Sequence, residues 1–185
     1  LPAVLACTLS FALEQFLRPR PIAPWRRPLA AVCLHLGLWL LLFVSLLVLS
    51  RRPWMAATGL SALMLLVVLV SIAKLHTLRE PFVFQDFEYF ADALRHPRLY
   101  LPFFGFWRTV IAALAGSLAV FGGLGLEPAM TLSDLFAPIV LLTVIAAALL
   151  SGGAAAAGAE VTFEPASDIS RLGLLACLWR YGAAE

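Results

Sequence analysis

The chain has 185 residues, of which 62% are hydrophobic and 13% charged, and its mean hydropathy is +0.95. So few charged side chains cannot cover a soluble surface of this size, which excludes an ordinary soluble enzyme domain and a disordered chain. The net charge of +2, without a dense block of Lys and Arg, also argues against a nucleic-acid binder and leaves an integral membrane protein or a membrane domain.

Four stretches without Asp, Glu, Lys or Arg have the length that a bilayer requires, about 17–25 residues. A shorter apolar stretch at the N-terminus runs to Glu14 and ends at an Arg-Pro-Arg-Pro sequence, and we interpret it as the end of a first span whose beginning is missing. We therefore expect an all-α, polytopic bundle of about five transmembrane helices in a domain over 1–160. The predicted spans are 1–17, 29–50, 53–73, 103–126 and 135–159.

The connections agree with these spans. Four prolines hold the first connection extended, because each disfavours helix at the residue before it. The Arg51-Arg52-Pro53 turn predicts an antiparallel hairpin of the second and third spans. Small residues recur every four positions in the last two spans, which indicates close helix packing or only an Ala-rich bias. They are Ala115, Ala119 and Gly123, and Ala148, Gly152 and Ala156.

The spans contain few polar groups. No Asp, Glu, Lys or Arg lies at the centre of a long span, so nothing indicates a proton relay, a voltage sensor or an ion pathway. His35 is the only imidazole within a span, and we expect a neutral histidine hydrogen-bonded to a neighbouring helix. Glu14 has a stronger claim to a functional site than His35, but it lies near a span end, where it can reach water.

The segment 74–102 between the third and fourth spans is too charged to span a membrane and too aromatic for a plain loop. Asp86 can cap a helix and Pro97 can stop it, which predicts an interfacial amphipathic helix over 86–96. At 100° per residue the two faces separate, and Asp92 can pair with Arg95 and His96. The apolar face holds Phe87, Phe90, Ala91 and Leu94, and the polar face holds Glu88, Asp92, Arg95 and His96.

Arg79, Arg95 and Arg98, with His96, are our candidates for binding an anionic lipid headgroup, because guanidinium groups bind phosphate bidentately. The alternative is a solvated face whose charges pair with one another. The acidic residues of the segment have no metal-ligand spacing, and the chain contains no recognisable nucleophile, phosphate-loop or dinucleotide motif. We therefore predict no catalytic, cofactor or metal residue within these 185 residues.

Two segments resemble a known family. SIAKLHTLREPFVFQDFEYFADALRHPRLYLPFFG (71–105) resembles the segment after the third span of bacterial lipoteichoic-acid-synthase-like proteins, which belong to the sulfatase/alkaline-phosphatase superfamily. TFEPASDISRLGLLACLWRYGAAE (162–185) resembles their exit from the last span. Only these two segments are specific, since apolar spans match many proteins by composition alone.

The resemblance implies a membrane-anchoring domain of a sulfatase-fold enzyme of the bacterial inner membrane. Such enzymes transfer phosphoglycerol from phosphatidylglycerol or hydrolyse sulfate or phosphate esters. Their Thr (or modified Cys or Ser) nucleophile and their divalent metal, commonly manganese, belong to a C-terminal catalytic domain outside this sequence. Residues 161–185 would then be a linker helix toward that domain, and the expected partners are that domain and membrane lipids, without nucleic acid.

The family arrangement places the N-terminus in the cytoplasm and the C-terminus outside. Eight basic residues would then lie in outer connections and two, Arg51 and Arg52, in an inner one, which is the reverse of the positive-inside rule. A stand-alone non-catalytic membrane subunit and a transporter fragment are the alternative functions. The sequence leaves open the acceptor substrate and whether the enzyme transfers a group or hydrolyses an ester. It also leaves open the orientation of the chain in the membrane and the oligomeric state.

Overall fold

The computed structural model describes residues 1–96, 98, 102 and 104–184, and in this part of the chain all regular secondary structure is helical. Four helices are long and apolar enough to cross a membrane, which confirms the predicted all-α membrane bundle. They are α2 (Leu29–Ser50), α3 (Pro53–Leu78), α6 (Phe106–Leu126) and α7 (Leu132–Ala155).

The N-terminal helix α1 (Pro2–Glu14) is shorter than the predicted first span. Its 13 residues extend over about 20 Å at 1.5 Å per residue, whereas the hydrocarbon core of a bilayer is about 30 Å thick. Within the described chain α1 is therefore an apolar helix that packs on the bundle and lacks the length of a complete span.

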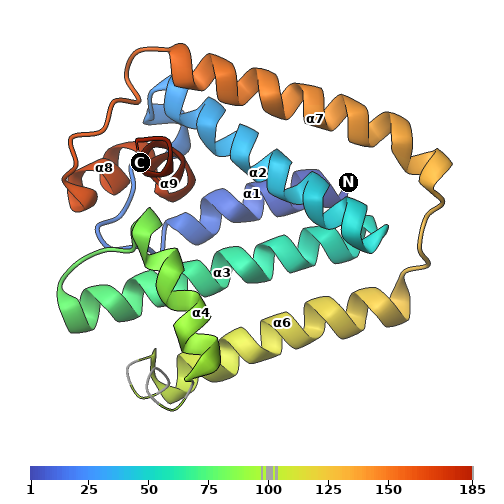
Figure 1. Cartoon of the computed structure of the whole chain (residues 1–185), viewed down its shortest axis with the longest axis horizontal. Helices are drawn as coiled ribbons and strands as arrows, with labels where there is room; N and C mark the ends of the chain where they lie inside the picture. The colour runs from blue at the N-terminus through green and yellow to red at the C-terminus, as the bar shows by residue number, and fades with distance from the viewer. Residues whose placement is uncertain (97, 99–101, 103, 185) are drawn as a thin grey trace.

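The four long helices lie side by side in the order α7, α2, α3, α6, and each packs on the next (Figure 1). α1 packs on α3 and α2.

Because successive long helices run in opposite directions, their connections gather at two ends of the bundle. The turn end holds the α2–α3 turn and the α6–α7 connection, 127–131. The tail end holds the first connection, 15–28, with the 3-10 turn η1 (Pro24–Arg26), and three short helices: α4 (Phe87–Arg95), α8 (Pro165–Leu172) and α9 (Leu174–Gly182).

Prolines and left-handed residues set the limits of α2 and α3. Pro28 precedes α2, and Pro53 is the first residue of α3, where a backbone N–H has no intrahelical partner to lose. Arg51 and Arg79 follow the last residues of these helices with φ angles of 54° and 64°. The left-handed conformation turns the chain out of the helix in each case.

The α6–α7 connection is fastened to the α2–α3 turn. The Glu127 carboxylate accepts hydrogen bonds from the N–H groups of Trp54 and Met55, both at 3.0 Å, and so satisfies free donors at the start of α3. The N–H of Met130 donates to the Arg51 carbonyl at 2.9 Å. The outer pair α6–α7 and the inner hairpin are thereby joined at the turn end.

Glycines allow the long helices to approach closely. A Cβ on Gly153 of α7 would lie 2.9 Å from the Ala30 carbonyl oxygen of α2, and one on Gly123 of α6 would lie 2.5 Å from Met55 of α3. The first predicted small-residue stripe is therefore a packing face, since Ala119 and Gly123 are both buried.

The second small-residue stripe, at residues 148, 152 and 156, makes no packing face within the described chain, which favours the alternative of an Ala-rich bias. Those three positions are exposed, and α7 turns Ala146, Leu150 and Gly153 toward α2 instead. Small residues occupy so many positions of this helix that a four-residue period fits more than one face.

Two predicted helix limits also differ. α3 continues to Leu78, five residues past the predicted limit at 73, because Lys74 extends from the helix without interrupting it. The predicted fifth span, 135–159, is displaced toward the N-terminus as α7, which begins after Thr131. The predicted limits follow from where charged residues are missing. The observed helix ends depend on caps and turns, so the two need not coincide.

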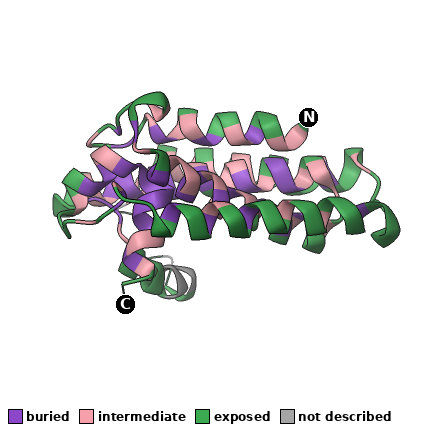
Figure 2. Ribbon diagram, turned by 90° about the horizontal axis from the view of Figure 1, so that it is seen from above, coloured by how far each residue is buried: buried purple, intermediate pink, exposed green. Residues whose placement is uncertain are grey.

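Buried residues concentrate near the tail end, and much of the surface of the long helices is exposed (Figure 2). α9 packs on α2 and on the 3-10 turn η2 (Phe84–Asp86). Its buried side chains include Leu174, Leu175, Cys177 and Leu178. Residues 165–182 therefore belong to the packed structure, as two helices with a break at Gly173.

Candidate functional site

Glu14, the last residue of α1, is the centre of a buried polar cluster at the tail end. Its Oε2 accepts a hydrogen bond from Arg27 Nη1 at 2.6 Å. Its Oε1 accepts from the backbone N–H groups of Leu174 and Leu175 at 2.9 and 3.2 Å. These N–H groups begin α9, where the helix dipole favours an anion. The Glu14 side chain is 0% exposed, so of the two alternatives that the sequence allowed, contact with water is excluded.

Arg27 reaches this cluster from the first connection and is also 0% exposed. Its Nε donates to the Ile22 carbonyl at 2.9 Å, and its guanidinium carbon lies 5.8 Å from the centre of the Phe11 ring. Gly173 faces the ion pair with a φ of 86°, and a Cβ there would lie 2.8 Å from Glu14 Oε2. A glycine at this helix break is therefore required by both the backbone conformation and the space.

His35 extends the cluster into α2. Its Nε2 lies 3.0 Å from Ser10 Oγ, and its ring stacks on Phe11 with the centres 3.9 Å apart. Its Nδ1 lies 3.3 Å from Glu14 Oε1. The prediction of a histidine hydrogen-bonded to a neighbouring helix is confirmed, and the neighbour is α1.

Asp168 forms a second buried polar centre, in the first turn of α8. Its carboxylate accepts hydrogen bonds from the Thr162 N–H at 3.0 and 3.1 Å and from the Thr162 hydroxyl at 3.0 Å. It also accepts one from the Tyr181 hydroxyl of α9 at 3.0 Å. Asp168 is 0% exposed and thus joins the α7–α8 connection to both short helices.

Burial changes two titratable groups of α9. Burial raises the pKa of Cys177 to about 12, and the carboxylates of Asp168 and Glu14 act in the same direction. Burial also raises the pKa of Tyr181, and its hydrogen bond to Asp168 adds to this. Both groups remain protonated at neutral pH, so Cys177 has the character of a small apolar core residue.

A third polar contact orders the chain between α3 and α4. Lys74 Nζ donates to both oxygens of Asp86, at 2.8 and 2.9 Å, and the Val83 N–H donates to Asp86 Oδ2 at 2.7 Å. Asp86 is the N-cap residue of α4, as predicted, but its side chain makes no capping hydrogen bond to α4, because it closes η2 and holds Lys74. The contact fixes the direction in which the chain leaves α3.

The four residues predicted to bind a headgroup, Arg79, Arg95, His96 and Arg98, are all exposed at the tail end. Arg95 Nη1 lies 4.0 Å from Asp92 Oδ1 with its side chain 75% exposed, so the predicted pairing is a loose surface contact. His96 meets Asp92 through a backbone hydrogen bond of 2.8 Å. Within the described part of the chain, no hydrogen bond or ion pair joins these four side chains to one another, and the headgroup site stays a prediction.

The predicted amphipathic helix is present as α4, Phe87–Arg95. On its predicted apolar face, Phe87 packs edge-on against Phe82 with the ring centres 5.1 Å apart. The side chains of Phe90, Ala91 and Leu94 lie outside the described part of the chain, as does Pro97.

Among the described residues, no three His, Cys, Asp or Glu side chains lie close enough together to hold a metal ion. The acidic groups of the tail end are used by backbone N–H groups and by basic side chains, as for Glu14 and Asp86. These arrangements stabilise the junction of helices. The Ser10 hydroxyl lies beside the His35 imidazole, but it is buried and donates to the Cys7 carbonyl at 2.7 Å.

Sequence reasoning missed the cluster around Glu14 because its partners lie far apart in the chain, 160 residues in the case of Leu174. Two signals were present. Glu14 is an acidic residue at the end of an apolar helix, where an unpaired charge would be costly. Gly173 separates two amphipathic helical segments, which leaves the N–H groups of the second without intrahelical partners.

A scan against known protein families, a search of curated proteins and a search of solved structures found no match to this chain. Composition, helix length and the exposed apolar surfaces of α6 and α7 define the class: a helical membrane protein with several spans. Its polar features lie at the two ends of the bundle.

Proposed function

We propose that this chain is the membrane-anchoring domain of a sulfatase-fold enzyme of the bacterial inner membrane. In this proposal the enzyme transfers phosphoglycerol from phosphatidylglycerol, or hydrolyses sulfate or phosphate esters, at the outer face of that membrane. The nucleophile and a divalent, manganese-type metal would belong to a catalytic domain after residue 185. The resemblance of 71–105 and 162–185 to lipoteichoic-acid-synthase-like proteins is the origin of the proposal.

The observation that carries it is that these two segments, far apart in sequence, pack against each other. Phe82 shares one buried core with Leu178 and Tyr181. A Cβ on Gly182 would lie 2.8 Å from the Phe84 ring, so α9 and η2 are in close contact. The parts of the chain that carry the resemblance therefore form one structural unit at the tail end.

This unit gives the proposed domain a physical role. α9 is held by the buried contacts of Glu14 and Asp168, so a domain attached after α9 would emerge beside η2, the turn before α4, at a fixed place. The exposed basic residues Arg79 and Arg95 lie at the same end. An anionic lipid approaching the catalytic domain from the membrane would meet these charges first.

The reading frame after the codon for residue 185 provides the first test. A soluble domain with a Thr or Cys nucleophile and Asp and His metal ligands is the expected result. A stop codon at that point would refute the proposal and favour the stand-alone membrane subunit.

Activity of the full protein provides the second test. In proteoliposomes containing phosphatidylglycerol, we expect Arg79→Ala and Arg95→Ala to reduce headgroup transfer several-fold with unchanged thermal stability. Arg18→Ala is the matched control, because Arg18 is exposed in the first connection at the same end. Equal activity in all three variants would refute the role of the two arginines.

A further inference from the structure

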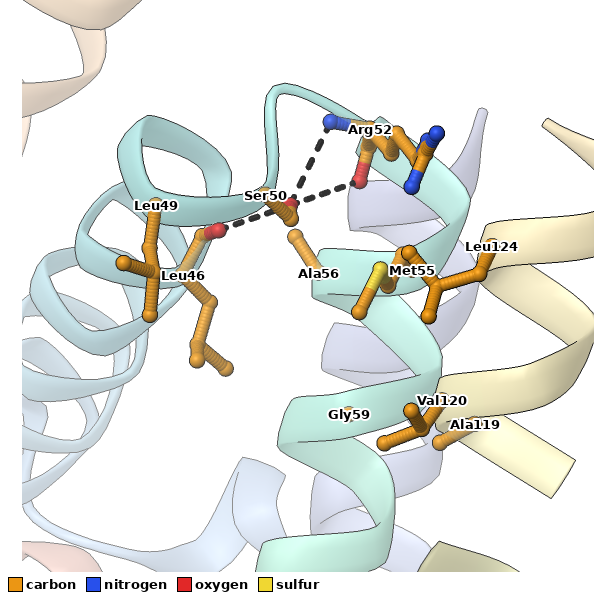
Figure 3. Close-up of a pocket in the computed structure, with 10 residues that line it drawn as sticks. All are labelled: Leu46, Leu49, Ser50, Arg52, Met55, Ala56, Gly59, Ala119, Val120 and Leu124. Atoms are coloured by element: carbon orange, nitrogen blue, oxygen red, sulfur yellow. Dashed lines mark hydrogen bonds between the residues drawn. The ribbon is translucent and has the colours of Figure 1, made fainter. Parts of the chain in front are cut away.

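A groove at the turn end lies between α2, α3 and α6, opposite in the bundle to α4 and α9. It encloses about 330 Å³. In Figure 3, Leu46 and Leu49 of α2 form one side and Val120 and Leu124 of α6 form the other, with α3 between them. Arg52, the residue before α3, lies at the upper edge of the groove in this view.

The walls of this groove suit a hydrocarbon chain. Leu49 is 83% exposed and Leu124 is 51% exposed, so the groove opens at the apolar surface that the membrane covers. Gly59 contributes no side chain to the floor, and a Cβ there would have no neighbour nearer than Leu46 Cδ1, at 4.0 Å. Apolar cavities bind apolar groups in preference to water.

Arg52 gives the groove a charged edge. Its Nε is buried and has no hydrogen-bond partner among the described residues. The Nη groups of Arg52 are not fully buried and make no hydrogen bond or ion pair within the described part of the chain, so they are the donors that an acceptor from outside the chain can reach. Phosphate matches a guanidinium group in charge and in bidentate geometry.

The neighbouring polar groups are bonded elsewhere and leave the Arg52 guanidinium available. Both oxygens of Glu127, the acidic residue of the adjoining connection, accept hydrogen bonds from the start of α3. Ser50 Oγ lies between the Leu46 carbonyl and the Arg52 backbone, with hydrogen bonds of 2.8 and 3.3 Å. Arg51 is exposed one residue earlier and adds positive charge at the same edge.

We propose that this groove binds an anionic phospholipid, with one acyl chain along Gly59 and the phosphate on Arg52. The lipid would belong to the leaflet at the turn end, whereas the residues Arg79 and Arg95 lie at the tail end. The inference depends on the membrane location of the chain and is independent of the proposed catalytic role.

Two variants separate the acyl-chain contact from the headgroup contact. Gly59→Leu fills the groove, and Gly122→Leu is its matched control because a Cβ on Gly122 meets nothing within 4 Å. Arg52→Gln removes the charge, and Arg26→Gln is its control at an exposed position of the tail end.

Native mass spectrometry of the detergent-solubilised full chain measures the binding of dioleoylphosphatidylglycerol and of dioleoylglycerol, which has the same acyl chains and no phosphate. We expect one saturable site that prefers phosphatidylglycerol. Arg52→Gln should weaken phosphatidylglycerol binding about tenfold, the loss of one charge-assisted hydrogen bond, and leave dioleoylglycerol binding unchanged. Gly59→Leu should weaken the binding of both lipids, and the two control variants should bind as the wild type does.

Other results would overturn the proposal. Binding without saturation, or equal phosphatidylglycerol binding by Arg52→Gln and Arg26→Gln, would refute the site. An equal loss of both lipids in Arg52→Gln would show that Arg52 shapes the groove and does not recognise the headgroup. If Gly59→Leu aggregates, a second substitution in the groove, Val120→Phe, replaces it and must weaken the binding of both lipids for the proposal to stand.

Discussion

Glu14→Gln is the perturbation that tests the buried cluster most directly. Glutamine keeps an oxygen that can accept from the N–H groups of Leu174 and Leu175, so the substitution removes mainly the charge. Arg27 would then remain 0% exposed without a counter-charge, and its Nη1 would face an amide. Breaking a buried ion pair by removing one partner costs about 3–5 kcal/mol in the free energy of unfolding. For a chain of this size that corresponds to a decrease in Tm of about 6–20 °C.

The assay is thermal unfolding of the purified protein in detergent, followed by circular dichroism. Glu164→Gln is the control, because Glu164 is exposed and makes no side-chain hydrogen bond as the N-cap of α8, so a change below about 1 kcal/mol is expected. The double variant Glu14→Gln/Arg27→Met removes both charges and should be more stable than Glu14→Gln alone. A Tm for Glu14→Gln equal to that of the control would refute the view that this ion pair holds α9 on the bundle.

Three further variants test other contacts of the fold. Gly153→Leu should destabilise the protein by about 2 kcal/mol, on the order of other overpacked cores. Gly152→Leu should unfold at the wild-type temperature, because a Cβ on Gly152 meets nothing within 4 Å. Equal Tm values for the two variants would contradict the α2–α7 packing. Tyr181→Phe should cost about 1.5–3 kcal/mol as a lost hydrogen bond to a buried carboxylate, and Tyr89→Phe, at an exposed position, should cost almost nothing in the same measurement. In a variant whose other two cysteines are alanine, Cys177 should resist maleimide at pH 8, because its pKa is raised to about 12. It should react after the protein is unfolded in SDS. Rapid labelling of the folded protein would contradict the burial of Cys177.

The sequence predicted the limits of the long helices well where prolines and a tight turn set them. α2 begins and ends at the predicted residues, because Pro28 precedes its first turn and the Arg51-Arg52-Pro53 turn ends it. The limits of α3 and α7 were less accurate, because charge-free windows do not follow helix caps. Lys74 ended the predicted third span, yet it is a helical residue whose long side chain reaches Asp86.

The candidate site was harder to predict because its geometry depends on contacts between distant segments. His35 was correctly expected to bond a neighbouring helix, but the identity of that helix follows only from the packing of α1. For Glu14 the sequence allowed contact with water, because no residue close to it in the chain covers its carboxylate. In the structure the start of α9 covers it. Hydrophobic periodicity reports the environment of a residue, whereas partners across 160 residues depend on the tertiary fold.

The distance along the chain between Glu14 and α9 has a consequence for biosynthesis. A ribosome adds about 5–20 residues per second, so the N–H groups of Leu174 and Leu175 are made roughly 8–32 s after Glu14. During that interval α1 and Arg27 can pair, but no helix end covers the carboxylate. α1 therefore reaches its final environment only when α9 has been translated. A nascent chain interrupted before residue 174 would differ at α1 from a chain that includes α9.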